Sequence, residues 1–374
     1  MQRGDNGVME RLSNGLVRAP AFVDLHVHFR EPGFTEKEDI KSGAVAAAAG
    51  GYRAVCMMPN TRPVIDSVSA LMDADRRGRE VFIETGVRIF AASAMTLSQA
   101  GRALADFGAM DRAETRCRAE TGHGVCGISE DGKTLKNEKL MEEVCLAAVR
   151  LGLPVMDHAE PEAETIERDA WLARKTGARF HIQHVSLAES VRLLRAAKKE
   201  GLLVTCETAP HYFALTEEET KPERSGTNAK MNPPLRSESD RLAIVEGLAD
   251  GAIDCIATDH APHEEAAKTL PFEEAANGVV GLEAAFPVAY TTLVKSGALS
   301  FGGLIRLMSA RPAEIIGLPS APGDYVELDL DTPWEIDPEA FLSKGRNTPF
   351  GGMRVYGRVV RTLTGGREVF AARG

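Results

Sequence analysis

Short apolar segments alternate with alanine-rich amphipathic segments through most of this 374-residue sequence. The apolar segments are rich in β-branched residues and short enough for strands, whereas the segments between them carry apolar residues at helical spacing. Strands are predicted at residues 21–27, 52–58, 87–92, 124–128, 154–157, 179–185, 202–206 and 252–257. Strands that alternate with helices form parallel sheets, so eight of them predict an α/β fold of the closed (β/α)₈ TIM-barrel type.

The helices between these strands are predicted from Ala, Leu, Glu and Lys at helical spacing. They cover residues 37–49, 97–107, 137–151, 162–176, 187–200 and 239–249. Several of them are followed by a glycine, as at Gly152 and Gly177, which favours a left-handed helix cap. After the eighth strand, further helices are expected at 282–295 and 301–308.

The last part of the chain has a different pattern. Residues 325–328, 355–362 and 368–370 alternate like antiparallel strands and are separated by Pro and Gly turns. We therefore expect two parts. Residues 20–318 form a metal-dependent barrel, and residues 1–19 and 319–374 form a small, reduced β appendage.

Composition excludes several functional classes. The formal net charge is −10 and there is no basic run, which disfavours nucleic acid as a partner and favours a small molecule. No apolar run reaches the roughly 18 to 20 residues of a membrane span, and the first residues lack a secretory signal pattern. The six cysteines form no CxxC pair, so we expect reduced, buried thiols and a cytoplasmic protein.

Candidate metal ligands follow the ends of several predicted strands. His26 and His28 are two residues apart at the end of the first strand, so their side chains point to the same side. His158, His184 and Asp259 follow the fifth, sixth and eighth strands. The carboxyl ends of barrel strands meet at one rim, where these side chains should converge. Four imidazoles and a carboxylate suit two adjacent zinc ions better than one tetrahedral site that keeps an open position.

Two adjacent cations need an anionic bridging ligand, which we expect from the fourth strand. That strand is followed by Glu130, Asp131 and Lys133. Asp131 or Glu130 can bridge directly, whereas Lys133 can do so only after carboxylation by CO₂. Exposed Glu and Lys side chains are the norm in loops, which weakens the case for Glu130 and Lys133.

The same rim offers groups for amide hydrolysis. A carboxylate beside a metal and its water, such as Asp259, can take the proton of the attacking water and return it to the leaving nitrogen. Arg30 is two residues beyond His28, and its guanidinium suits a substrate carboxylate. Asn60 follows the second strand and adds a neutral donor.

Several motifs resemble the signature segments of dihydroorotases: DLHVHFREPG at 24–33, MPNTR at 58–62, NAKMNPPLR at 228–236 and ATDHAPH at 257–263. The similarity runs from about residue 18 to the C-terminus. It implies a metal-dependent hydrolase of cyclic amides that interconverts N-carbamoyl-L-aspartate and L-dihydroorotate in pyrimidine biosynthesis.

The resemblance also implies roles for individual residues. The implied metal ligands, for two Zn²⁺ ions, are His26, His28, Asp131, His158, His184 and Asp259. Asp259 is implied as the catalytic acid and base, and Asp131 as the bridging ligand. The implied substrate contacts are His28, Arg30, Asn60, Asn232, His263 and the segment Asn277-Gly278.

The sequence also departs from the family pattern. Only about 20 residues precede the first barrel strand, and the segment after His158 is short. In both respects the chain resembles the compact dihydroorotase domain of the animal multifunctional pyrimidine protein, which uses a carboxylated lysine.

Alternatives remain for function and partners. They are another cyclic amidohydrolase, such as a dihydropyrimidinase, hydantoinase or allantoinase, and a non-catalytic scaffold for aspartate carbamoyltransferase. A homodimer and an association with that transferase are the partner states left open. Four histidines have no assigned role: His123, His181, His211 and His260. His181 should point away from His184, towards the helices or behind the ligands.

Overall fold

The computed structural model describes residues 9–112 and 124–372. Eight parallel strands form one sheet in which each strand pairs with the next along the chain. They are β3 (Phe22–Val27), β4 (Tyr52–Met57), β5 (Arg88–Ala94), β6 (Gly124–Ser129), β7 (Val155–Asp157), β8 (Phe180–Ile182), β9 (Val204–Thr208) and β10 (Cys255–Ile256). A parallel bridge between Val27 and His260 joins the first strand to the segment after the last. The predicted (β/α)₈ barrel and its eight strands are confirmed.

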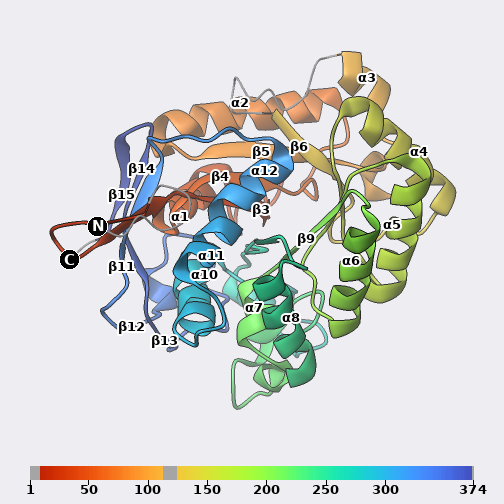
Figure 1. Cartoon of the computed structure of the whole chain (residues 1–374). Coiled ribbons are helices and arrows are strands. Elements are labelled where there is room, and N and C mark those ends of the chain that lie inside the picture. The colour runs from red at the N-terminus through yellow and green to blue at the C-terminus, as the bar shows by residue number, and fades with distance from the viewer. Residues whose placement is uncertain (1–8, 113–123, 373–374) are drawn as a thin grey trace.

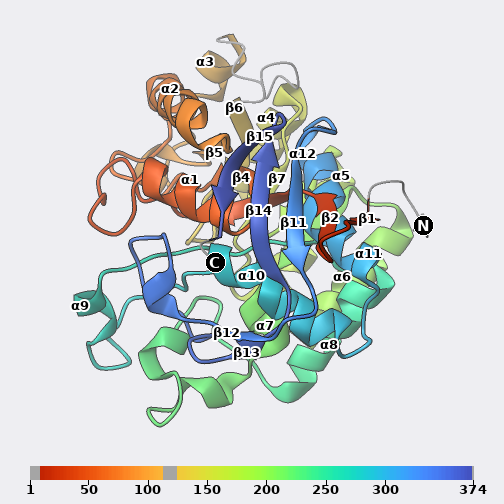
Figure 2. The same ribbon diagram turned by 90° about the vertical axis from the view of Figure 1, so that its left-hand side faces the viewer.

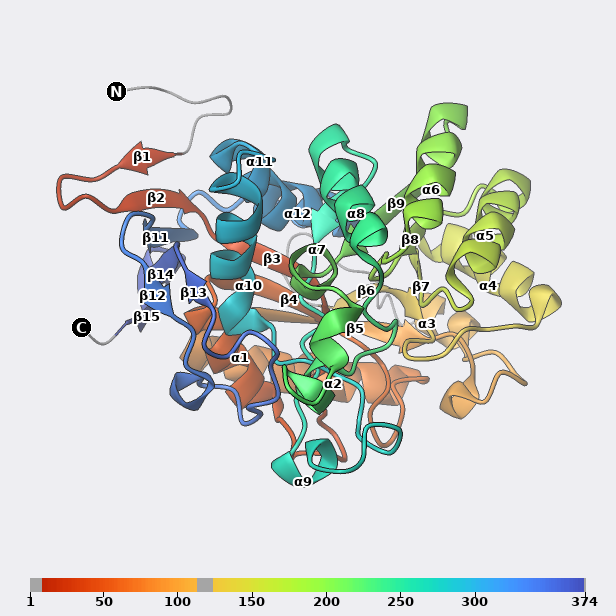
Figure 3. The ribbon, with the colours of Figure 1, turned by 90° about the horizontal axis from the view of Figure 1, so that it is seen from below.

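Helices surround this sheet, and Figure 1 shows α4, α5 and α6 side by side along one flank. The longer ones are α1 (Ile40–Ala49), α2 (Val68–Thr85), α4 (Glu138–Leu151), α5 (Glu162–Thr176), α6 (Ala188–Glu200), α8 (Glu238–Asp250) and α10 (Leu282–Ala289). The shorter ones are α3 (Phe107–Arg112), α7 (Pro210–Ala214), α9 (Glu265–Lys268), α11 (Phe301–Ile305) and α12 (Arg311–Ile316). Two π-helical turns, η4 (Tyr290–Val294) and η5 (Arg306–Ala310), extend α10 and join α11 to α12. Figure 3 shows α9 on a loop that stands apart from the other helices.

One predicted helix was wrong and one helix was missed. Residues 97–107 do not form a helix: a single 3₁₀ turn, η1 (Leu97–Gln99), is followed by irregular chain up to α3. The buried carboxylate of Glu130 accepts hydrogen bonds from the backbone N–H groups of Met95 and Thr96, which fixes the chain in a non-helical path. The long helix α2 was missed because few of its side chains are buried and its sequence is rich in Asp and Arg.

A small apolar cluster fills the inside of the barrel. It combines buried residues of several strands, such as Leu25, Phe90 and Met156, with Ile315 and Ile316 of α12. The larger cluster joins the outer faces of the strands to the helices. The packed interior supports a site on the barrel rim rather than a channel through it.

The appendage is a five-stranded antiparallel sheet in the order β1-β2-β11-β14-β15, which faces the viewer in Figure 2. Its strands are β1 (Glu10–Arg11), β2 (Val17–Pro20), β11 (Tyr325–Asp329), β14 (Arg358–Thr364) and β15 (Arg367–Ala371). A separate pair joins β12 (Trp334–Glu335) to β13 (Arg354–Val355). The predicted small β appendage is therefore confirmed, with strands from both ends of the chain.

Two further predictions concern cysteines and membranes. Cys126, Cys145, Cys206 and Cys255 are buried free thiols, as predicted, and Cys56 is buried too. Cys117 and His123 lie outside the described residues. Among residues 9–112 and 124–372, no helix combines the length and the apolar character that a membrane span requires.

Candidate functional site

Asp131 lies at the centre of four histidines on the rim of the barrel. Its Oδ1 atom is 3.4 Å from Nε2 of His26, 3.2 Å from Nδ1 of His158 and 3.4 Å from Nε2 of His184. Its Oδ2 atom is 3.4 Å from Nε2 of His28. Burial alone would raise the pKa of Asp131, but the imidazoles of His26, His158 and His184 hold it well below its usual range. A carboxylate shared among four imidazoles is the arrangement that a bridging ligand needs.

Asp259 contacts the two histidines that follow β3. Its Oδ1 atom lies 3.1 Å from Nε2 of His28 and 3.5 Å from Nε2 of His26. Burial would raise the pKa of Asp259, yet the charges of His26 and His28 keep it well below its ordinary value. Asp259 is therefore ionised and can accept a proton.

The second ring nitrogen of His26 and of His28 is held by a neighbour. Nδ1 of His26 lies 2.8 Å from Oε1 of Glu207, and Nδ1 of His28 lies 3.0 Å from Oδ1 of Asn60. Each oxygen can accept a hydrogen bond from Nδ1–H, and Nε2 is turned toward Asp131 or Asp259, where a metal would take the place of a proton. A ring with its proton on Nδ1 alone is the form that binds a metal through Nε2.

The donor set fits a metal. His26 is fully buried, and its Nε2 atom has no hydrogen-bond partner among the described residues. Three groups of donor atoms among the described residues lie within 4.8 Å of one another, and two of them contain the predicted ligands: His26, His28 and Asp259, and His26, Asp131 and His184. The third group is His181, Glu207 and Cys255. Imidazole nitrogens and carboxylate oxygens are the ligands that zinc takes in hydrolases. A cation between these groups would satisfy the unpartnered nitrogen.

Three residues of the site have a left-handed backbone, which is unusual for side chains larger than glycine. The φ angles are 59° at Arg30, 36° at His184 and 48° at Asp259. Each residue follows the end of a barrel strand, where the chain turns across the rim. Such conformations cost about 1–3 kcal/mol each and cluster at functional sites. The surrounding structure thus holds these side chains in place at a cost in stability.

The two other candidates for the bridging ligand lie elsewhere. Glu130 is buried against Met95 and Thr96, whose backbone N–H groups donate to its Oε2. Nζ of Lys133 donates to the carbonyl of Gln99 at 2.9 Å. Of the three residues considered, Asp131 is the one whose carboxylate lies against the four histidines.

Most of the residues predicted to contact the substrate line a cavity of about 140 Å³ beside these ligands, and His263 lies outside its lining. Its lining includes His28, Arg30, Asn60, Asp131, His158, Asn232, Asp259, Asn277 and Gly278. Gly278 has a φ of +144°, and a Cβ atom there would approach the carbonyl oxygen of Ala261 to 2.5 Å. Glycine therefore lets the chain come close to the pocket. The cavity is smaller than the roughly 300–1,000 Å³ of drug-sized ligand pockets, so it suits a substrate of few atoms.

His263 lies beside the pocket among cations. Its Nε2 atom is 2.8 Å from the carbonyl of Asn277 and 3.3 Å from Arg30, and Nζ of Lys37 lies 3.4 Å from its Nδ1. Lys37 has only donors, so Nδ1 accepts and Nε2 carries the proton that it donates to Asn277. Burial, followed by the charges of Arg30 and Lys37, lowers the pKa of His263 to about 3. The imidazole is therefore neutral.

The structure places the histidines without an assigned role in different surroundings. Nε2 of His181 lies 3.1 Å from Oε2 of Glu207, so this ring lies behind His26. Its expected direction, towards the helices, was wrong, because β8 ends at Ile182 and strand alternation does not extend to His184. His260 is buried against Glu38, and His211 is buried next to Tyr212.

Three functional candidates were missed from the sequence. Glu207 holds His26, Lys37 faces His263, and Lys268 donates to the backbone of the pocket loop. An acidic residue directly after an apolar strand is a signal that could have identified Glu207. Lys37 and Lys268 stand in charged segments that are typical of exposed surface, so the sequence offers no such signal for them.

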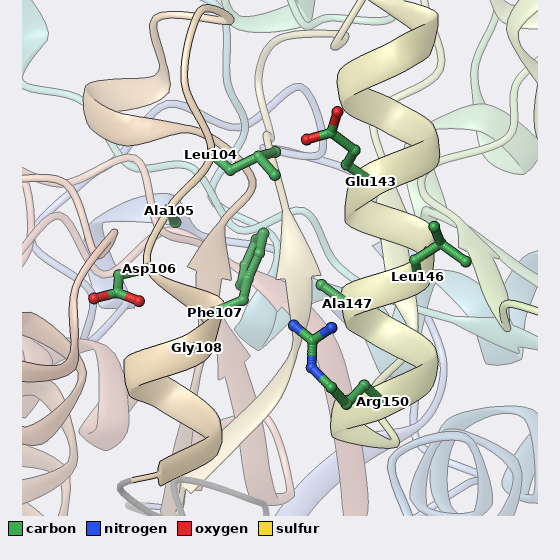
Figure 4. A pocket seen from close by; sticks show the side chains of 9 residues that line it. All are labelled: Leu104, Ala105, Asp106, Phe107, Gly108, Glu143, Leu146, Ala147 and Arg150. Atoms are coloured by element: carbon green, nitrogen blue, oxygen red, sulfur yellow. The ribbon is translucent and has the colours of Figure 1, made fainter.

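A second cavity, of about 350 Å³, lies away from this rim. It is bounded by residues 104–108 and by one side of α4 with Glu143, Leu146, Ala147 and Arg150. Figure 4 shows Phe107 and Arg150 facing this space. Its lining contains none of the predicted site residues.

Comparison with known proteins agrees with this geometry. The sequence matches the amidohydrolase family over residues 18–369. It is 41% identical to a dihydroorotase from Desulforapulum autotrophicum, over 95% of this chain and 87% of that protein. It is 39% identical to a dihydroorotase from Brevibacillus brevis, over 95% of this chain and 88% of that protein.

Among solved structures, an L-hydantoinase from Arthrobacter aurescens superposes with a TM-score of 0.82. It is 24% identical and covers 94% of this chain and 85% of its own, a likeness that shows the shared fold alone. Amidohydrolases are metal-dependent, in agreement with the donor groups on the rim. The chain therefore belongs to the amidohydrolase family and, within it, to the dihydroorotases.

Proposed function

We propose that this chain is an active dihydroorotase, which interconverts N-carbamoyl-L-aspartate and L-dihydroorotate in pyrimidine biosynthesis. The observation that carries the proposal is the Asp131 carboxylate, which lies within 3.4 Å of a nitrogen of each of four histidines, beside a small pocket that contains Arg30. The chain is about 40% identical to dihydroorotases over nearly its whole length, which supports the same activity.

We propose two zinc ions as the cofactor. His26, His28 and Asp259 would hold one ion, His158 and His184 the other, and Asp131 would bridge them. The metal, when bound, supplies Lewis acidity to the attacking water and to the amide carbonyl of the substrate. Glu207 and Asn60 keep Nε2 of His26 and His28 available as ligand atoms.

Asp259 is the proposed proton carrier. Its carboxylate is ionised and lines the pocket, so it can take the proton of the attacking water. The new C–O bond forms at the amide carbonyl of dihydroorotate, the ring C–N bond breaks, and Asp259 gives the proton to the leaving nitrogen. Ring closure follows the reverse order.

Arg30, Asn60 and His263 are the proposed grip on the substrate carboxylate. A guanidinium can bind a carboxylate through two parallel hydrogen bonds. The Asn60 amide nitrogen remains available because its oxygen faces His28. The single N–H of the neutral His263 donates to the Asn277 carbonyl and would reach the substrate carboxylate only by leaving that carbonyl. Asn232 and the backbone of Asn277-Gly278 line the rest of the pocket and are proposed to contact the ring.

The test is turnover of dihydroorotate, hydantoin and allantoin by metal-loaded protein, together with metal content. We expect turnover of dihydroorotate in clear excess over the other two. We expect Asp131→Ala to lose at least one metal ion and most activity. Preferential turnover of hydantoin or allantoin would identify another cyclic amidohydrolase. Zinc-loaded protein without any ring opening would instead favour a scaffold role beside aspartate carbamoyltransferase.

We also propose residues 20–318 as the catalytic barrel, residues 1–19 and 319–374 as the appendage, and the cytoplasm as the compartment. The buried free thiols support a reducing environment. A homodimer is the proposed assembly. Measurement of the particle mass in solution, with and without aspartate carbamoyltransferase, tests for the homodimer and for an association with that transferase.

A further inference from the structure

Lys268 is a buried lysine beneath the loop that lines the substrate pocket. It is the last residue of α9, and only 4% of its surface is exposed. Its Nζ atom donates to the carbonyl oxygens of Lys230 at 3.2 Å, Ala276 at 2.9 Å and Gly278 at 3.2 Å. Within residues 9–112 and 124–372, no carboxylate forms an ion pair with it.

A buried cation without an anionic partner is costly, because the charge loses its hydration and gains only carbonyl dipoles in return. Burial, followed by the charge of Lys230, lowers the pKa of Lys268 to about 8. A neutral side chain with N–H donors could hold the same loop at a smaller cost. The three hydrogen bonds alone therefore do not explain why the buried donor at this position is a charged lysine.

The loop connects this charge to the pocket. The carbonyl of Gly278 accepts from Lys268 and also from Nδ2 of Asn347, at 3.0 Å. The neighbouring carbonyl of Asn277 accepts from His263, whose ring lies 3.3 Å from the Arg30 guanidinium. Lys268 thus lies one layer of backbone behind the residues proposed to bind the substrate carboxylate.

We propose that Lys268 is a positioning residue that determines specificity: its buried, unpaired charge and its hold on residues 276–278 favour cyclic amides that carry a carboxylate over neutral ones. The inference rests on the proposed function. Lys268 does not line the pocket, so it acts through the loop and through its field. In a site of low dielectric, such a charge attracts a bound anion over several ångströms, and salt screens this attraction while the anion still approaches through solvent. Arg30 then supplies the direct contact.

The test compares Lys268→Met, which removes the charge and the donors, with Lys268→Gln, which keeps donors alone, and Lys268→Arg, which keeps the charge. For Lys268→Met we expect a KM for dihydroorotate about tenfold higher with kcat changed less than about threefold, because ground-state binding of the anion is lost. Lys268→Gln should behave similarly, and Lys268→Arg should recover most of the affinity. Lys199→Met, which removes an exposed charge on α6, is the matched control and should match wild type.

The salt dependence of kcat/KM distinguishes the effect of the Lys268 charge from the effect of its hydrogen bonds to the loop. Wild-type kcat/KM should fall between about 0.05 M and 0.5 M NaCl, and the fall should be shallower in Lys268→Gln. A KM within twofold of wild type in Lys268→Gln, or an equal loss in the Gln and Arg variants, would overturn the proposal. Should Lys268→Met fail to fold, the Gln and Arg pair decides.

Binding of orotate, measured by titration calorimetry on metal-loaded protein, distinguishes this inference from the proposed function. Wild type that binds orotate more tightly than Lys268→Gln but opens no ring would contradict the proposed function and keep the inference. Wild type that turns over dihydroorotate, with equal orotate affinity in both proteins, would contradict the inference alone.

Discussion

The carboxylate of Glu207 links His26 to His181: its Oε1 atom lies 2.8 Å from Nδ1 of His26, and its Oε2 atom lies 3.1 Å from Nε2 of His181. All three side chains are buried. Burial would raise the pKa of Glu207, but the hydrogen bonds from His181 and His26 lower it to about 2. The carboxylate is thus ionised and fixes the tautomer of a metal-ligand candidate from behind.

Glu207→Gln should weaken metal binding by about 10- to 100-fold. The carboxylate accepts hydrogen bonds from both His26 and His181, whereas the amide oxygen can accept from one ring and the NH₂ group then faces the N–H of the other. Competition with a metal chelator measures the affinity directly, independently of turnover. Glu200→Gln changes an exposed carboxylate at the end of α6 and serves as the control. Equal metal affinity in Glu207→Gln and wild type would show that His26 keeps its orientation without this carboxylate.

Lys133→Met tests whether a carboxylated lysine has any part in the metal centre. The Lys133 ammonium donates to the Gln99 carbonyl at 2.9 Å rather than to the metal-ligand candidates. We expect wild-type metal content and a kcat within about threefold, as for most surface substitutions. Loss of a metal ion in this variant, together with wild-type metal binding that depends on added bicarbonate, would contradict this expectation. It would assign the bridging role to Lys133 instead of Asp131.

The sequence was sufficient for the barrel because its signal is local: an apolar run, a polar strand end and an amphipathic helix recur along the chain. The sequence pattern fails where a contact with a residue far along the chain determines the local backbone conformation. Residues 97–107 have helical propensity, but the Glu130 carboxylate and the Asp131 carbonyl hold this segment by hydrogen bonds from another part of the chain. Helix α2 was missed because few of its side chains are buried, so its sequence shows only a weak apolar periodicity.

For the site, the ligand candidates could be identified because they follow strand ends in a parallel barrel. Burial is a tertiary property, so Lys268 in a charged segment could not be distinguished from an exposed lysine. The left-handed backbone at His184 and Asp259 also has no sequence signal, because His and Asp adopt it only when the surrounding structure imposes it.

Asp259→Asn should keep the fold and abolish turnover. The amide has nearly the same size as the carboxylate but cannot take up the proton of the attacking water, so we expect kcat to fall by about 100-fold or more. Metal content and thermal unfolding of the variant should be measured with the rate, because Asp259 also contacts His28. A variant that retains its metal and turns over near the wild-type rate would show that another group carries the proton.

Glu283 should make stability depend on pH. Its carboxylate is buried, accepts the backbone N–H groups of Leu342 and Ser343, and has its pKa raised by burial from 4.5 to about 7. The folded state therefore binds the proton more tightly than the unfolded state, and this stabilisation is complete below pH 4.5 and lost as the pH rises through 7. Between pH 5 and pH 8 the loss is roughly 2–3 kcal/mol of unfolding free energy. Urea unfolding at both values should show that Glu283→Gln loses less stability than wild type over this interval. Equal losses in the two proteins would mean that Glu283 is already ionised at pH 5 in the folded state.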